Sequence, residues 1–244
     1  MEYDLTIFEK GLEELGIALS QEQKKQFLTY YEHLVEKNKV MNLTAITEYN
    51  EVILKHFLDS LSIVKVGSFD QKNLAGKSVI DMGTGAGFPG IPLKIAFPEL
   101  KITLLDSLNK RVNFLNEVIE MLGLKDVTAV HGRAEDYAKQ KEHREKYDFC
   151  VSRAVANLST LSEYCIPFVK EGGSFISYKS GKIDEELKQA ENAVKILGGK
   201  VQNVVKFPLM DTDMDRSFVV IKKMKPTAKK YPRKAGLPSK EPLI

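Results

Sequence analysis

The segment VIDMGTGAGFPGIP, residues 79–92, constrains the fold more than any other part of the sequence. A β-rich run reaches Asp81 and is followed by Gly83, Gly85 and Gly87, which predicts a tight turn without β-carbons at the carboxyl end of a strand. Open α/β sheets bind their ligands at that edge. We therefore expect a mostly parallel sheet with a ligand site above this turn.

Short β-rich runs alternate with helical stretches from Lys77 onward, which is typical of an α/β sheet covered on both faces. The expected seven strands lie at residues 78–82, 101–106, 127–131, 147–152, 174–179, 201–207 and 217–223, and the expected helices at about 90–97, 109–122, 157–168 and 183–197. Paired glycines at 172–173 are expected to end a helix or form the following turn. The last two strands are too close for a crossover helix, so they should form an antiparallel hairpin at the sheet edge.

The flanking parts of the chain have different patterns. Residues 1–66 are expected to be helical, with a capping box formed by Ser20 and Gln23. Residues 67–224 should form the sheet domain. Residues 225–244 contain four prolines and many cations, which favours an extended arm, either packed on that domain or projecting from it.

Composition excludes several other classes of protein. The hydrophobic fraction of 43% and the charged fraction of 28% are ordinary for a globular chain, which argues against disorder and coiled coil. No apolar run reaches the roughly 18–20 residues of a membrane span, so we expect a cytoplasmic protein without a membrane partner. Cys150 and Cys165 lack metal-ligand spacing and are expected to be buried thiols. The sequence does not define the oligomeric state, for which a monomer is the default expectation.

The formal net charge of +3 is concentrated at one end of the chain. Residues 222–244 carry +7, which leaves −4 for the rest. A cationic arm suits an electrostatic contact with RNA phosphates, and Tyr231 would be available to stack on a base. The alternative for this segment is a solubilising tail.

Two classes of ligand fit the glycine turn. Gly85, Gly87 and Gly90 match the G-x-G-x-x-G pattern of dinucleotide sites, which is a weak signal by itself. Asp81 favours S-adenosyl-L-methionine, because a carboxylate there would repel a pyrophosphate but suits a cationic amine and sulfonium. The expected terminal hairpin is also unlike the standard dinucleotide fold. The methyl donor is therefore the preferred ligand.

Further cofactor residues are expected at the end of the second strand and after the third. Asp106 is placed to accept hydrogen bonds from two ribose hydroxyls, although it could instead cap the helix that begins near Leu108. Arg133, Ala134 and Glu135 would flank an adenine. Glu135 could equally be a first-turn carboxylate that the helix dipole stabilises.

Seven strings together resemble one family over the region from about residue 38 to the C-terminus: NLTAI, HFLDSL, DMGTGAGFPGIPL, TLLDSLNKRVNFL, GRAED, SRAVANL and KKYPRKAGLPSKEP. They resemble the RsmG (GidB) family of bacterial 16S rRNA guanine-N7 methyltransferases. The resemblance implies a class I (Rossmann-like) methyltransferase fold with a small helical N-terminal region. It also implies S-adenosyl-L-methionine as cofactor and a guanine in the decoding-centre loop of 16S rRNA as acceptor, in free rRNA or the small subunit. The implied cofactor contacts are Gly83, Phe88, Ala134, Glu135 and Arg153.

The residues after the fourth strand bear on which atom is methylated. Enzymes acting on exocyclic amines commonly carry Asn-Pro-Pro-Tyr there, whereas this chain has SRAV at 152–155. A cytosine-C5 enzyme needs a reactive thiolate, and neither Cys150 nor Cys165 has the expected context. Guanine N7 has an unprotonated lone pair, so direct in-line transfer requires no general base. Arg153 is accordingly expected to position the substrate, and catalysis to depend chiefly on alignment.

Other polar residues are weaker candidates. Asn42, Lys179 and Arg216 could hold the guanine or its backbone, but Asn42 equally fits a turn and the two cations equally fit solvated strand ends. His56 and Asp59 share a helical face without a third metal ligand, so no metal site is predicted and a structural pair between the helices and the sheet is expected. A methyltransferase for small molecules or proteins, and a non-catalytic nucleotide- or RNA-binding module, remain alternatives.

Overall fold

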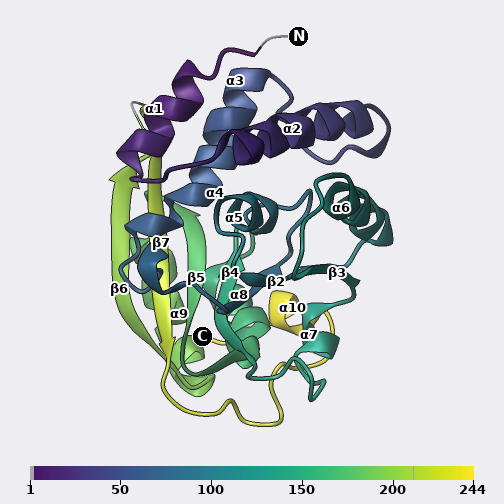
Figure 1. The fold of residues 1–244 in the computed structure, drawn as a ribbon. Coiled ribbons are helices and arrows are strands. Elements are labelled where there is room, and N and C mark those ends of the chain that lie inside the picture. The colour runs from purple at the N-terminus through teal and green to yellow at the C-terminus, as the bar shows by residue number, and fades with distance from the viewer. Residues whose placement is uncertain (1–2, 211) are drawn as a thin grey trace.

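The computed structural model describes residues 3–210 and 212–244, and its centre is a seven-stranded sheet (Figure 1). The strand order is β3-β2-β1-β4-β5-β7-β6, in which β7 is antiparallel to both neighbours and the other pairs are parallel. The strands are β1 (Ser78–Met82), β2 (Lys101–Asp106), β3 (Val127–His131), β4 (Tyr147–Ser152), β5 (Val169–Ser180), β6 (Gly199–Pro208) and β7 (Asp215–Lys223). The predicted mostly parallel sheet with an antiparallel terminal hairpin is confirmed.

The helices after β1 follow the predicted alternation. They are α5 (Gly90–Ala96), α6 (Asn109–Met121), α7 (Ala134–Tyr137), α8 (Leu158–Cys165), α9 (Asp184–Ile196) and α10 (Leu237–Lys240). The first part of the chain forms α1 (Thr6–Glu14), α2 (Gln21–Met41), α3 (Tyr49–Val52), a π-helical turn (Ile53–Leu58) and α4 (Asp59–Leu61). The predicted capping box at the start of α2 is present, since Ser20 and Gln23 exchange hydrogen bonds.

One prediction about the glycines was wrong. Gly172 and Gly173 lie inside β5, where the register against β4 shifts, instead of ending a helix. Gly172 has a φ of 77°, and a β-carbon on Gly173 would lie 2.6 Å from the carbonyl oxygen of Asp148. Glycine is therefore required here by a close approach of two backbones within the sheet.

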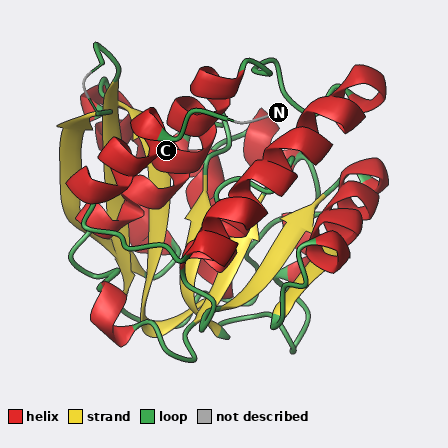
Figure 2. Ribbon diagram, turned by 45° about the horizontal axis from the view of Figure 1, so that its top comes forward, coloured by secondary structure: helices red, strands yellow, loops and turns green. Residues whose placement is uncertain are grey.

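Alternate residues of the central strands face two separate cores. Val79, Leu104 and Val151 lie in the core beneath α5, α6 and the N-terminal helices. Their neighbours Ile80 and Leu105 lie in the core on the opposite face, beneath α8 and α9. The two helical layers are visible on either side of the sheet in Figure 2. Both faces of β1 and β4 are buried, as the inner strands of a parallel sheet require.

Residues 3–66 share the first of these cores with the sheet. Phe27 and Phe57 are fully buried in the same cluster as Val79 and Leu104. α2 also contacts the turn after β1 directly, because the buried hydroxyl of Tyr30 donates to the carbonyl oxygen of Ala86 at 2.5 Å. The N-terminal helices thus support the glycine turn from behind.

The C-terminal residues pack on the opposite side of the sheet domain. Tyr231 is only 7% exposed and belongs to the core beneath α8 and α9, and Pro232 is also buried. The expectation that Tyr231 is available to stack on an RNA base was therefore wrong, because its ring is already covered by protein. The expected extended conformation is interrupted by the single turn of α10.

Two expectations from composition can be checked directly. Cys150 and Cys165 are buried free thiols, as predicted. Among the helices in the described parts of the chain, none combines the length and apolar composition that a membrane crossing demands.

Tyr30→Phe tests the support of the glycine turn by α2. The substitution leaves the Ala86 carbonyl buried without its donor, so we expect the free energy of unfolding to fall by about 1–3 kcal/mol in urea titrations. Tyr31→Phe is the matched control on the same helix, because the Tyr31 hydroxyl donates to the partly exposed Thr47 carbonyl at 3.2 Å. An equal or larger loss for Tyr31→Phe would contradict the special role of Tyr30.

Candidate functional site

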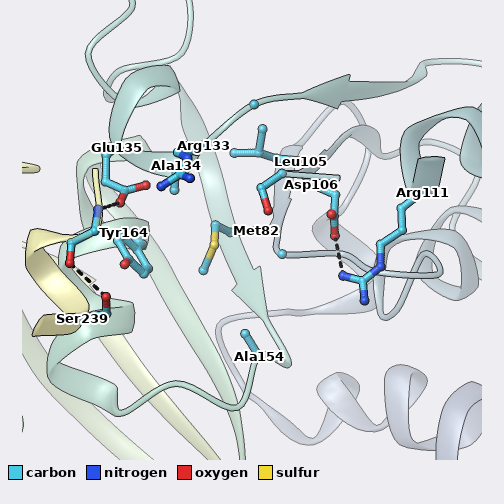
Figure 3. Close-up of a pocket in the computed structure, with 14 residues that line it drawn as sticks. Met82, Leu105, Asp106, Arg111, Arg133, Ala134, Glu135, Ala154, Tyr164 and Ser239 are labelled. Atoms are coloured by element: carbon cyan, nitrogen blue, oxygen red, sulfur yellow. Dashed lines mark hydrogen bonds and ion pairs between the residues drawn. The ribbon is translucent and has the colours of Figure 1, made fainter. Parts of the chain in front are cut away.

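A cavity of about 440 Å³, here called the first cavity, opens at the carboxyl ends of β1–β4 (Figure 3). It lies where the chain order of the sheet reverses between β1 and β4, the usual ligand position in such sheets. Its lining residues are Met82, Gly83, Leu105, Asp106, Ser107, Arg111, Gly132, Arg133, Ala134, Glu135, Ala154, Tyr164, Gly236 and Ser239. The predicted residues Gly83, Asp106, Ala134 and Glu135 are thus brought together.

The carboxyl group of Asp81 lies beneath the glycine turn and does not line the first cavity. It is fully buried, and its Oδ2 accepts hydrogen bonds from Thr84 Oγ1 at 2.6 Å and from the Gly90 amide at 2.8 Å. Burial raises its pKa to about 7. Asp81 therefore ties the end of β1 to the start of α5, a role that differs from the expected exposure to a cationic ligand.

The glycines of the turn have different surroundings. Gly83 lines the first cavity, and the Gly85 amide donates to Asp106 Oδ2 at 2.9 Å. A β-carbon on Gly87 would lie 2.6 Å from an Ile91 side-chain carbon. Gly87 therefore permits close packing behind the turn, whereas Gly83 and Gly85 lie at or beside the first cavity.

Asp106, toward one end of the first cavity, connects β2 to the glycine turn and to the start of α6. Besides the Gly85 amide, it accepts a hydrogen bond from the Leu108 amide through Oδ1 at 2.9 Å, and Arg111 Nη1 lies 3.5 Å from Oδ2. The alternative role as a helix cap is therefore partly present: Asp106 accepts from the amide of Leu108, which is the N-cap residue of α6. Oδ2 therefore has two donors already, whereas Oδ1 has one and keeps a second lone pair for a ligand.

Ala134 and Glu135 begin α7 at the other end of the first cavity. Glu135 is 5% exposed, and its Oε1 accepts a hydrogen bond from the Gly236 amide at 2.9 Å. Arg133, also predicted, lines the first cavity beside them (Figure 3). The carboxylates of Asp106 and Glu135 thus lie toward its two ends.

Arg153 lines a second cavity of about 490 Å³ and is not among the lining residues of the first. Ala154, the next residue, lines both. Phe88 also lies outside the lining of the first cavity: its ring stacks on His56 with centroids 4.4 Å apart and lies 5.5 Å from the guanidinium carbon of Arg153. Phe88 therefore packs behind Arg153, and the implied cofactor contacts of both residues stay predictions.

Asp59 holds two arginines at the second cavity. Its Oδ2 accepts a hydrogen bond from Arg153 Nη1, and its Oδ1 accepts one from Arg216 Nε, both at 2.9 Å. His56 Nδ1 lies 3.2 Å from Arg153 Nη2, and burial followed by the charge of Arg153 lowers the pKa of His56 to about 3. The expected structural pair between the helices and the sheet is confirmed, with Arg153 as the residue contacted.

The other candidates for holding a substrate are separated by the structure. Lys179 and Arg216 both line the second cavity. Lys179 Nζ donates to Glu186 Oε1 at 2.6 Å and is largely buried, and Arg216 is paired with Asp59. Neither cation is therefore a solvated strand end. Asn42 is exposed, ends α2 with a φ of 51° and lines neither cavity, which favours its alternative reading as a turn residue.

Several lining residues were not predicted. Tyr164, Gly236 and Ser239 line the first cavity, and Lys55 and Glu186 the second. They come from segments remote in sequence from the glycine turn. Gly236 and Ser239 lie in the terminal string KKYPRKAGLPSKEP, which carries part of the family resemblance but whose cations predict an RNA contact or a solubilising tail and no cavity wall.

Comparison with known sequences identifies close relatives. The GidB family model, described as rRNA small subunit methyltransferase G, matches residues 23–215. A protein of Lachnoclostridium phytofermentans named Ribosomal RNA small subunit methyltransferase G is 58% identical over 241 residues, which cover 99% of this chain and 98% of the relative. A protein of the same name from Lactobacillus johnsonii is 51% identical over 237 residues, covering 97% and 98%.

Solved structures share the fold at low sequence identity. MtNAS in complex with MTA and tNA has a TM-score of 0.54 and 16% identity, covering 89% of this chain and 82% of that chain. M. jannaschii TYW2 in complex with AdoMet has a TM-score of 0.50 and 14% identity, covering 64% and 75%. These similarities establish a shared fold.

Asp81→Asn tests the buried carboxyl group beneath the turn. An unfolded aspartate ionises near pH 4, whereas Asp81 has a folded-state pKa of about 7, so the folded protein holds the extra proton between these values. The wild-type free energy of unfolding should therefore fall as the pH rises through this window. Asparagine keeps an acceptor oxygen but cannot ionise, so denaturant titrations should show a smaller fall for the variant. Identical pH dependence would show that Asp81 is not protonated in the folded state.

Proposed function

The chain belongs to the GidB family, rRNA small subunit methyltransferase G, and on that premise we propose that it methylates N7 of a specific guanine in 16S rRNA. The methyl donor is S-adenosyl-L-methionine, and the acceptor is the decoding-centre loop in free rRNA or in the small ribosomal subunit. Such a reaction takes place in the bacterial cytoplasm. The support comes from the residues of the two cavities and from the fold.

The first cavity fits the cofactor in size and in polar groups. Its volume of about 440 Å³ lies within the usual range for small-molecule sites. Asp106 would accept hydrogen bonds from the ribose hydroxyls, and Ala134 and Glu135 would lie beside the adenine. Gly83 allows the methionine portion to approach the backbone. S-adenosyl-L-methionine supplies an electrophilic methyl group on a sulfonium.

The position of Ala154 in the lining of both cavities is the single observation that carries the proposal. A donor in the first cavity and a base in the second would be neighbours across this small side chain. The charged residues lining the second cavity are Lys55, Arg153, Lys179 and Arg216 against Asp59 and Glu186, a formal excess of two positive charges. That excess favours an anionic acceptor such as RNA over a neutral small molecule.

Methylation at N7 needs no general base, which agrees with the side chains around the second cavity. The N7 lone pair forms the new nitrogen–carbon bond as the carbon–sulfur bond breaks, so the leaving thioether takes the electron pair and no proton moves. The nearby imidazole of His56 is buried, with Nδ1 beside Arg153 and Nε2 2.9 Å from Thr44 Oγ1. Catalysis by alignment of the two reactants therefore accounts for the arrangement without a general base.

Methyl transfer from labelled S-adenosyl-L-methionine is the direct test. We expect incorporation into unmethylated small subunits or unmethylated 16S rRNA, and digestion should release labelled 7-methylguanosine. Subunits that already carry the modification are the control and should accept no label. Label in another nucleoside would refute N7 as the acceptor. Transfer to a protein or small molecule alone, or no transfer to any substrate form, would refute the proposed function.

Arg153→Ala tests the assignment of Arg153 to the acceptor side. Loss of the guanidinium should lower kcat/KM for RNA by at least about tenfold, about 1.4 kcal/mol in transition-state stabilisation. The affinity for S-adenosyl-L-methionine, measured by calorimetry without RNA, should remain within about twofold, because Arg153 lies outside the first cavity. A selective loss of cofactor affinity would instead place Arg153 on the cofactor, and wild-type turnover would remove it from the site.

A further inference from the structure

Residues 225–244, here called the C-terminal segment, are anchored along the sheet domain from their start. The Arg144 guanidinium donates to the backbone carbonyls of Thr227 at 2.7 Å, Ala228 at 3.3 Å and Tyr231 at 2.9 Å. The buried Tyr231 ring then fixes the chain against the core beneath α8 and α9. This part of the segment is therefore a packed structural element.

A buried ion pair fixes the next part of the C-terminal segment. Glu163 in α8 has no exposed surface, and Arg233 contacts both of its oxygens, through Nε at 3.0 and 3.1 Å and through Nη2 at 2.7 Å. The Arg233 amide also donates to Glu163 Oε1 at 2.7 Å. These hydrogen bonds raise the pKa of Arg233. Because an unpaired buried carboxylate is costly, the pair determines where the chain passes α8.

The C-terminal segment then forms one wall of the first cavity. Three residues after Arg233, the Gly236 amide donates to Glu135 Oε1 at 2.9 Å, and Ser239 Oγ donates to the Gly236 carbonyl at 3.0 Å (Figure 3). Gly236 and Ser239 line the cavity together with Tyr164. The bond from Gly236 uses one oxygen of Glu135 and leaves the other for a ligand.

Some cations that suggested an RNA-binding tail are used inside the protein. Lys223 is 2% exposed and lies 3.0 Å from Glu145, and Arg233 is paired with Glu163. By contrast, the side chain of Lys234 is exposed. The cations near the C-terminus therefore have two separable roles, and the position of Arg233 lets it hold the cavity wall in place.

We propose that the C-terminal segment is part of the cofactor site, in which Gly236 and Ser239 contact the nucleoside end of the cofactor. Arg233 and Glu163 are positioning residues that hold this wall and, through Gly236, orient Glu135. The inference rests on the proposed function, because it takes S-adenosyl-L-methionine as the ligand. The C-terminal segment then controls the affinity for the cofactor, in addition to any contact that it makes with RNA.

Arg233→Gln in the full chain tests the positioning pair, with Lys234→Gln as the matched control. Both variants remove one positive charge from adjacent residues, but only Arg233 contacts Glu163. We expect the Kd for S-adenosyl-L-methionine, measured by calorimetry without RNA, to rise at least about tenfold in Arg233→Gln and less than about twofold in Lys234→Gln. In Arg233→Gln, the KM for the cofactor should rise more than the KM for RNA, and saturating cofactor should restore most of kcat.

Unchanged cofactor affinity in a folded Arg233→Gln variant would overturn the inference. So would an equal rise in the KM for RNA in both variants with no change in cofactor affinity. If the wild type binds no S-adenosyl-L-methionine, the proposed function itself fails, which separates the two results.

Ser239→Phe keeps the test decisive if Arg233→Gln does not fold. Ser239 is exposed at the cavity wall, so a phenyl ring should weaken cofactor binding at least about tenfold while the thermal midpoint without cofactor stays unchanged. Wild-type affinity in this variant would remove Ser239 from the site and overturn the proposed wall.

Discussion

The hydrogen bonds of the buried Asp81 carboxyl group determine how the chain leaves β1. By accepting from both Thr84 and the Gly90 amide, one oxygen closes the glycine turn and fixes the start of α5. The Gly85 amide then points to Asp106, which connects the turn to β2. α2 also packs against this turn through Tyr30. The shape of the cavity edge at the end of β1 is therefore fixed by a buried polar group that no ligand needs to touch. Two local hydrogen bonds thereby set the geometry of a site built from several strands.

The central strands were predictable because their signals are local. β1 to β4 occupy the expected residues, since each is a short apolar run bounded by turn residues. The start of β5 was missed because Gly173 is required by the backbone of Asp148 in the neighbouring strand. Nothing in the sequence around Gly173 distinguishes that requirement from a helix-ending glycine.

The residues of the site that lie at strand ends were predictable from the sequence. Asp106 ends a recognisable strand and Ala134 and Glu135 follow another, and the structure brings them into one cavity. Tyr164 and Ser239 depend on how α8 and the C-terminal segment fold back, which local pattern does not encode. The error over Tyr231 has the same origin, because a cationic stretch with an aromatic residue has the same composition whether it is packed or projects into solvent.

The charge of the second cavity has a consequence for turnover. Alkylation of N7 gives the guanine a positive charge, and the base would then lie among Lys55, Arg153, Lys179 and Arg216. Since Asp59 and Glu186 offset only part of that charge, the proposed product base would be repelled by the same surroundings that would attract the RNA. Product release would therefore be assisted by the reaction itself, and a methylated site would be a poor competitor for substrate.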